Sequence, residues 1–437
     1  MSEITKGLYT NSSIIVTTMG ELKRYLGTVA LALGSLLNYS PAMAEKEAKA
    51  NIPTFEEQEM PQNIPDSNQL TPKTTPLPEQ PCTKQEILIP FSNPTRSTEA
   101  NTQAYLGATR LFGKGLEYLS KETGADQSAW GRAGELILGF TGDSLGEVLS
   151  HESSHKREIE RYGGNGKISI SPFRYGIFSG GYYECAADNQ LTPEQSARTA
   201  WAGLNQHTLN ADEISRRARK QKNTIDDISY IGNTVVAALK TNGIGDGQDV
   251  INGLAAMGME AGQKDLQRNT TIITALDPQL AESVYNLGDF IANGERAHTP
   301  VSADIADGWK VYLPHFAQYF TPNGTFAKAT LPAEIANVPV ELGVRHDLPF
   351  KDSELKAFQA GGRAYIDTGF MEVSPYAYLG RNDGKTSRAV GLDIRLPIIA
   401  GLTLESTVSH SADDLIEQAV KGNRNGWKGF AGLTVTF

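Results

Sequence analysis

The chain is poor in cysteine, in clustered basic residues and in long apolar runs, and each shortage removes a class of protein. It has 2 cysteines in 437 residues, too few for a disulfide-stapled scaffold or a four-cysteine zinc site. The 40 Lys plus Arg and 50 Asp plus Glu give a formal charge of −10 without a basic tail. Nucleic acid is therefore not an expected partner. No apolar run reaches the roughly 18 residues of a certain membrane-spanning helix.

The first 44 residues have the three parts of an export signal. Lys23 and Arg24 precede an apolar stretch, which is followed by small residues up to Ala44. A basic region, an apolar region and a small-residue cleavage site in this order predict a signal peptide. Met19 is a second possible start that gives a signal of ordinary length, and a buried N-terminal helix is the alternative. We therefore expect an exported protein of the periplasm or outer membrane.

Residues 45–100 are predicted to be a disordered tether. Prolines recur among Thr, Gln, Asn and Glu, and such a stretch buries too little apolar surface to fold. Cys82 lies in this tether and Cys185 in the domain behind it. In an oxidising compartment the two thiols either pair or remain separate, and the sequence leaves both open.

Residues 101–300 are predicted to form a helical domain. Ser144 and Glu147 fit a capping box, with Ser144 as the N-cap of the helix that contains residues 151–155. Two short extended pieces, 168–173 and 175–183, with a Gly-Gly turn, supply either an edge strand for a substrate or a hairpin that covers the core. Apolar spacing and start signals predict helices at 105–119, 144–161, 193–222 and 278–292. Two segments rich in Gly and Ala, 228–239 and 250–259, are either small-residue helices packed closely together or segments that lie against a membrane surface.

Residues 301–437 are predicted to form an antiparallel β domain. Apolar and polar residues alternate with period two over several segments, as in half-buried strands. Asn382-Asp383-Gly384 is a turn signal between two of them. The fold class expected for the whole chain is therefore α+β, a helical domain followed by an antiparallel β domain.

The end of the chain resembles the closing strand of a bacterial outer-membrane β-barrel. Phe437 is terminal, and Val435 and Leu433 alternate back from it. The resemblance implies a small membrane barrel with one face toward lipid and the other toward the lumen. Pro339, Pro375 and Pro397 depart from the pattern because they fall in or beside strands. A soluble antiparallel sandwich gives the same alternation and is the alternative.

Residues 151–155 have the pattern His-Glu-Ser-Ser-His. On a helix His151 and His155 lie one turn apart on one face, so both imidazoles can bind one zinc ion. Glu152 is then placed to act as the general base toward a zinc-activated water. Over about fifteen residues the sequence resembles the zincin metallopeptidases, and this resemblance implies hydrolysis of peptide bonds. Two surface histidines on a charged helix end are the alternative.

The surroundings of the motif predict where it lies. Leu145, Val148, Leu149 and Ile159 form an apolar stripe that includes Glu152 and His155, so we expect the motif on the buried face of its helix.

A catalytic zinc also needs a third protein ligand. The helix from Pro193 carries the first candidate, His207, on a face with Ala200 and Gly203, which would let that helix come close. A plain polar helix residue is the alternative for His207. Asn205 and Gln206 are candidates for binding substrate backbone.

The function expected from the sequence is an exported zinc-dependent metallopeptidase of the cell envelope, with Zn²⁺ as cofactor and envelope peptides or proteins as substrates. One alternative is a non-enzymatic outer-membrane β-barrel protein with a chance motif. Another is a zinc hydrolase that acts on lipid or cell-wall amides, because the motif activates water without selecting the substrate.

Overall fold

The computed structural model describes eight stretches of the chain: 86–90, 97–175, 178–186, 191–217, 222–243, 248–399, 401–421 and 426–436. The predicted signal peptide, most of the predicted tether, Cys82 and Phe437 lie outside them. In the described stretches the chain has helices and a large antiparallel sheet, so the expected α+β class is confirmed.

Most of the described helices precede the strands of the large sheet along the chain; the exceptions are the first strand, which comes before them, and one short helix near the end. None of the described helices is both long and apolar enough to cross a membrane. They are α3 (Thr98–Thr123), α4 (Ala129–Arg161), α5 (Pro193–Arg217), α6 (Thr224–Thr241), α7 (Gln248–Met257), α8 (Gln263–Leu276), α9 (Pro278–Asn293) and α10 (Leu415–Lys421), with 3₁₀ turns at Ala125–Gln127 and Glu260–Gly262.

Helix α4 is longer than its sequence signals predict. Its N-cap is Ser128, whose hydroxyl accepts a hydrogen bond from the Gly131 N–H at 3.0 Å. The predicted capping box is therefore wrong, because Ser144 lies in mid-helix and its hydroxyl accepts from the Ser179 N–H at 2.7 Å. The predicted end at Arg161 is confirmed, and Gly163 follows with a positive φ of 82°.

A β-hairpin connects α4 to α5. It consists of β2 (Asn165–Tyr175) and β3 (Phe178–Ala186). Gly180 and Gly181 pair with Ser171 and Ile170 inside the hairpin, so they are strand residues and the predicted Gly-Gly turn is wrong. Strand β3 packs on α4, which places these two glycines beside the His-Glu-Ser-Ser-His motif.

The large sheet has 12 strands in the described part of the chain, in the order β1-β16-β15-β14-β13-β11-β10-β9-β7-β6, with β12 on β13 and β8 on β9. Across the described strands no pairing closes it into a barrel. The strands are β1 (Glu86–Pro90), β6 (Ser302–Ala306), β7 (Trp309–Tyr312), β8 (His315–Thr321), β9 (Gly324–Ile335), β10 (Val338–Leu348), β11 (Ala357–Ala364), β12 (Ile366–Asp367), β13 (Glu372–Asn382), β14 (Lys385–Ile399), β15 (Leu402–Ala412) and β16 (Gly426–Thr436). Two short strands, β4 (Lys222–Asn223) and β5 (Ala297–His298), pair separately.

The turn and the tether that the sequence predicts have different outcomes in this sheet. The turn at Asn382–Gly384 is confirmed, with positive φ at Asp383 and Gly384 as a tight hairpin turn needs. The predicted tether, in contrast, is too long at its end. Strand β1 lies within it and pairs antiparallel with β16, and α3 begins at Thr98.

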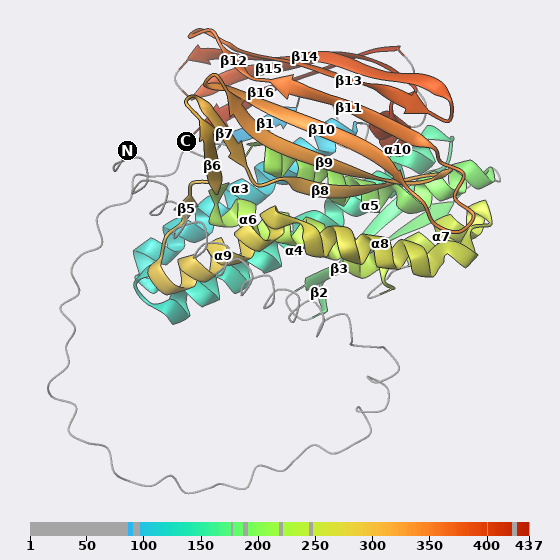
Figure 1. The fold of residues 1–437 in the computed structure, drawn as a ribbon. Helices are drawn as coiled ribbons and strands as arrows, with labels where there is room; N and C mark the ends of the chain where they lie inside the picture. The colour runs from blue at the N-terminus through green and yellow to red at the C-terminus, as the bar shows by residue number, and fades with distance from the viewer. Residues whose placement is uncertain are drawn as a thin grey trace, which may run out of the picture.

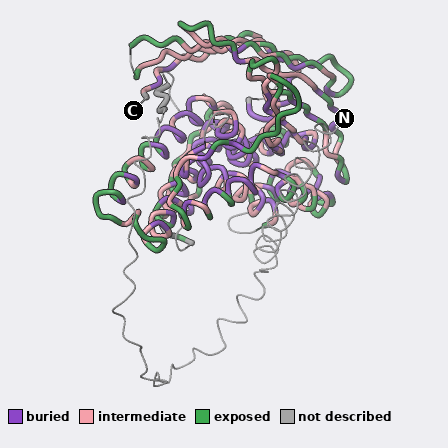
Figure 2. Tube along the Cα trace, turned by 60° about the vertical axis from the view of Figure 1, so that its left-hand side comes forward, coloured by how far each residue is buried: buried purple, intermediate pink, exposed green. Residues whose placement is uncertain are grey.

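The sheet covers one side of the helices (Figure 1). Helix α5 packs on β8, and Asn205 on it donates to the Phe320 carbonyl of β8 at 2.9 Å. Figure 2 shows that buried residues gather among the helices below the sheet. One apolar core cluster joins α5, α7, α8 and β8, and includes Trp201, Leu254, Leu266 and Phe320.

On β10, β11 and β13 to β16 the polarity is inverted relative to a sheet whose apolar face covers a core, whereas β8 and β9 bury apolar side chains such as Tyr319 and Phe326. On β11, Phe358 is 47% exposed while its neighbour Gln359 is fully buried. On β10, Val344 is exposed while Arg345 is buried and pairs with Asp414 at 2.7 Å. Other exposed apolar side chains of the sheet are Leu342, Leu379, Val390, Val408 and Trp427. Other buried polar ones are Ser387, Ser411 and Thr434.

Helix α4, which carries the His-Glu-Ser-Ser-His motif, also has exposed apolar and buried polar side chains. Leu145 and Leu149 of the predicted apolar stripe are 41% and 50% exposed, whereas His151, Glu152 and His155 are buried. The motif is buried as expected, and Ile159 of the predicted stripe is buried with it, but Leu145 and Leu149 of that stripe face outward. Polar residues fill the inner face of α4 instead.

Candidate metal site

His151, Glu152 and His155 lie in the last third of α4. The helix brings the two imidazoles to within 3.0 Å of each other, measured between their Nε2 atoms. The Thr199 carbonyl of α5 lies 2.6 Å from His155 Nδ1. A ring N–H at Nδ1 donates to this carbonyl and leaves Nε2 available as a metal ligand.

His151 is oriented by the close approach of α5. A Cβ at Gly203 would lie 2.2 to 2.4 Å from the atoms of the His151 ring. The predicted close contact of these helices through Gly203 is therefore confirmed. Burial and the Lys240 charge lower the pKa of His151 well below its usual value, which favours the neutral ring that a metal requires.

Asp249 completes a group of three ligand-type side chains. It lies in the first turn of α7, and its Oδ2 is 3.0 Å from His151 Nε2 and 3.7 Å from His155 Nε2. All three ligand atoms lie within 4.8 Å of one another. Two imidazoles and one carboxylate are a donor set that catalytic zinc uses, and three protein ligands leave the fourth position open.

Lys240 of α6 lies against these ligand atoms. Its Nζ is 2.8 Å from His151 Nε2 and 3.8 Å from Asp249 Oδ2. An ammonium group and a metal ion repel each other at such distances. Binding of a metal therefore requires Lys240 to turn aside, which its long flexible side chain allows.

A cavity of about 390 Å³ opens beside the group. Glu152 lines it, and a Cβ at Gly181 of β3 would lie 3.1 Å from Glu152 Cγ. His151, His207 and Lys240 line it as well. The apolar walls come from α4 and α6: Phe140, Val148, Ile231, Val235, Val236 and Leu239.

The other predicted site residues have different surroundings. His207 lines the cavity with its ring centroid 5.0 Å from that of His151, but it is not part of the three-residue group. Its Nδ1 is 3.1 Å from Asn233 Oδ1, and burial lowers its pKa to about 3.

The two carboxamides predicted to bind substrate are used inside the fold. Asn205 donates to the Phe320 and Ala419 carbonyls and accepts from the Phe320 N–H. Gln206 donates to Thr102 and accepts from Ser154. Both are buried, so each joins elements of the structure, and neither has the role that the sequence suggested.

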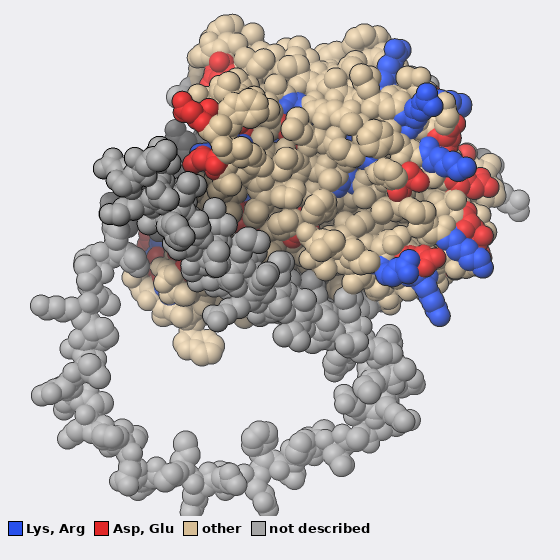
Figure 3. Space-filling model, in the orientation of Figure 1, with Lys and Arg blue, Asp and Glu red and all other residues tan. Residues whose placement is uncertain are grey.

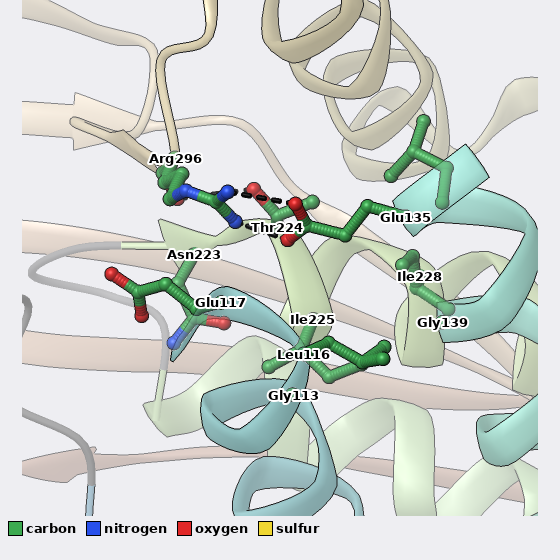
Figure 4. A pocket seen from close by; sticks show the side chains of 11 residues that line it. Gly113, Leu116, Glu117, Glu135, Gly139, Asn223, Thr224, Ile225, Ile228 and Arg296 are labelled. Carbon is green, nitrogen blue, oxygen red and sulfur yellow. Dashed lines mark hydrogen bonds and ion pairs between the residues drawn. The ribbon is translucent and has the colours of Figure 1, made fainter. Parts of the chain in front are cut away.

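A smaller cavity lies between α3, α4 and α6 (Figure 4). Its volume of about 30 Å³ is small, and a site of this size suits about one water molecule. Arg296 donates to both carboxylate oxygens of Glu135 beside it, and Glu117 pairs with Lys114 and Lys121. Because these charges are already paired, the cavity offers no chemistry comparable to that of the first.

No family model matches the chain, and no curated protein matches it.

Proposed function

We propose that the chain is a zinc-dependent hydrolase of peptide bonds. The observation that carries the proposal is the convergence of His151, His155 and Asp249 from two helices far apart in the sequence. Glu152 adjoins them on the same cavity. A chance motif on a helix surface would have neither burial nor a third ligand from another element.

The roles follow from the donor chemistry. His151, His155 and Asp249 would hold Zn²⁺, which lowers the pKa of a bound water and polarises a carbonyl. Glu152 would accept the proton of that water and pass it to the leaving amine. Lys240, once turned from the ligands, would place a positive charge where the carbonyl oxygen becomes negative.

Zinc content tests the proposal most directly. Purified wild type and Glu152→Gln should each bind one zinc per chain, and His151→Ala should lose it. Wild type should hydrolyse peptides from a panel, and Glu152→Gln should be slower by a factor of about 10² to 10⁴. Absence of zinc from all three proteins would exclude the metal site and the hydrolase with it.

The apolar cavity also favours a second substrate class. Its six apolar wall residues suit an acyl chain as well as a peptide side chain. A zinc hydrolase of lipid or cell-wall amides therefore remains the second candidate. A panel that holds peptides beside N-acyl amides separates the two, since each candidate predicts turnover of only one class.

We also propose that the outer face of the sheet lies against a membrane, in line with the exported, envelope-bound protein expected from the sequence. Alternate residues of the sheet are apolar and exposed, while their neighbours are polar and buried. In Figure 3 charged side chains gather mainly at the right-hand end, with a small acidic group at the upper left and a broad uncharged surface between them. A soluble sandwich would bury its apolar face, so the described sheet favours the membrane over that alternative.

A further inference from the structure

One carboxyl group in the large cavity has an oxygen without a hydrogen-bond partner. Glu147 is 4% exposed, and its Oε1 has no hydrogen bond from any described residue. It lines the cavity together with Glu152 and His151. A buried acceptor without a donor costs free energy, so a group that fills this place with a donor would be bound favourably.

Helix α6 comes very close to the carboxyl group of Glu147. A Cβ at Gly232 of α6 would lie 2.2 Å from Glu147 Oε1 and 2.9 Å from Asp143 Oδ2. A side chain at this position would displace the carboxyl groups from where they lie. Asp143 Oδ1 already accepts from Tyr105 and Ser229, at 2.7 Å each, so Glu147 is the acid with capacity to spare.

We propose that Glu147 binds the ammonium group of a substrate, and that the site therefore prefers a peptide with a lysine-like side chain beside the bond that is cleaved. The apolar walls of Val148, Val235 and Val236 would hold the methylene stem. This inference rests on the proposed peptide hydrolysis and names its substrate class.

The spacing on α4 supports this substrate. Glu147 and His151 are four residues apart on one helix, which separates them by about 6 Å along the axis. A four-carbon lysine stem covers a similar distance between the backbone and its charge. A bond held at His151 would thus place the ammonium group of a neighbouring lysine near Glu147.

The charges around the cavity agree with a cationic ligand. Asp143, Glu147, Glu152 and Asp249 are acidic, and Lys240 is the basic side chain among the described residues that line or adjoin it. Burial and the charge of Asp143 raise the pKa of Glu147, so the empty cavity favours a proton on this carboxyl group. A bound ammonium group would take the place of that proton as the neutralising charge, as buried charges require.

The experiment compares peptides that differ only in the terminal charge. A lysine peptide and its norleucine analogue are hydrolysed by wild type, Glu147→Gln and the control Glu122→Gln, which changes an exposed carboxyl on α3. We expect wild type and the control to prefer lysine about tenfold to hundredfold in kcat/KM, the range for a hydrogen bond to a charged group. Glu147→Gln should lose the preference and retain zinc.

A binding measurement keeps this inference separate from the proposed hydrolysis. The dissociation constants of both peptides are measured with Glu152→Gln, alone and combined with Glu147→Gln, by calorimetry. Free and acetylated N-termini distinguish a side-chain ammonium from an α-ammonium. Equal binding of lysine and norleucine peptides overturns the inference whether or not hydrolysis occurs. If the protein lacks zinc and hydrolyses neither peptide but still binds the lysine peptide more tightly than the norleucine peptide, only the proposed function is overturned.

Discussion

At the residue scale, Asp249 shows what sequence spacing does not reveal. It lies 94 positions after His155 in the numbering, and the loop before it has no metal-type pattern. The sequence pointed to His207, an imidazole on the neighbouring helix with better zinc chemistry. The described structure brings the carboxylate to the two imidazoles and leaves His207 hydrogen-bonded to Asn233.

Exchange of each candidate ligand tests this difference. Asp249→Ala should no longer bind zinc stoichiometrically, because only two ligands remain. His207→Gln should still bind one zinc, with at most the 10- to 100-fold weakening seen for residues around a metal site. Chelator competition measures both affinities. Loss of zinc in His207→Gln alone would show that the histidine is the ligand.

A second prediction at this scale concerns Gly203. Alanine there would place a methyl group 2.2 Å from the His151 ring, and overpacking of this kind costs about 1–3 kcal/mol. Gly115→Ala on α3 is the matched control, because its Cβ meets nothing within 4 Å. The control should be stabilised by about 0.4–1 kcal/mol. Urea unfolding measures both, and an unchanged Gly203→Ala would mean that α5 does not press on His151.

At the scale of elements, the packing of α6 on α9 is built around a buried acid. Asp227 accepts hydrogen bonds from Asn286 Nδ2, the shorter at 3.1 Å, and is fully buried. Burial raises its pKa to about 7. Below that pH the folded protein holds a proton on Asp227 that the unfolded chain releases above about pH 4.

The sign of the pH dependence follows from this difference. Between about pH 4 and pH 7 the folded state binds more protons than the unfolded state. As the pH rises through this range, the contribution of Asp227 to the unfolding free energy therefore falls by about 1.4 kcal/mol per pH unit. Asp227→Asn resembles the protonated acid and should remove this fall. We expect the variant to match wild type near pH 4 and to be more stable at pH 8. Urea unfolding of both proteins at several pH values measures this. An unfolding free energy that depends on pH in the same way for both would contradict the prediction.

Element boundaries show where local signals succeed. Helix α9 begins at Pro278, as Asp277-Pro278 predicts, and ends one residue past the expected Ala292. Helix α5 begins at Pro193 as predicted, and its described part ends at Arg217 rather than near Lys222. The capping box at Ser144 failed because the same residue types also serve inside α4, Ser144 toward β3 and Glu147 toward the cavity.

At the scale of the whole molecule, the distribution of tryptophans allows a test of the membrane proposal. Trp427 on β16 is 75% exposed, while Trp201 in the core is 1% exposed. Variants that keep only one of these, with the other tryptophans changed to Phe, would be reconstituted with phospholipids brominated in the acyl chains. We expect strong fluorescence quenching of Trp427 and little of Trp201. Equal quenching, or none, would contradict contact of the sheet with lipid.

The sequence by itself determined the α+β class, the change from helix to strand periodicity and the pair of histidines one turn apart, because these depend on residues within a few positions of each other. It did not determine which face of α4 or of the sheet is buried, since an apolar stripe marks a face without saying what covers it. The tertiary structure decided that polar residues lie on the inner face of α4 and of several strands of the sheet. It also decided that Asp249 joins the histidines and that Glu147 enters the cavity, because both depend on helices that meet only after the chain has folded.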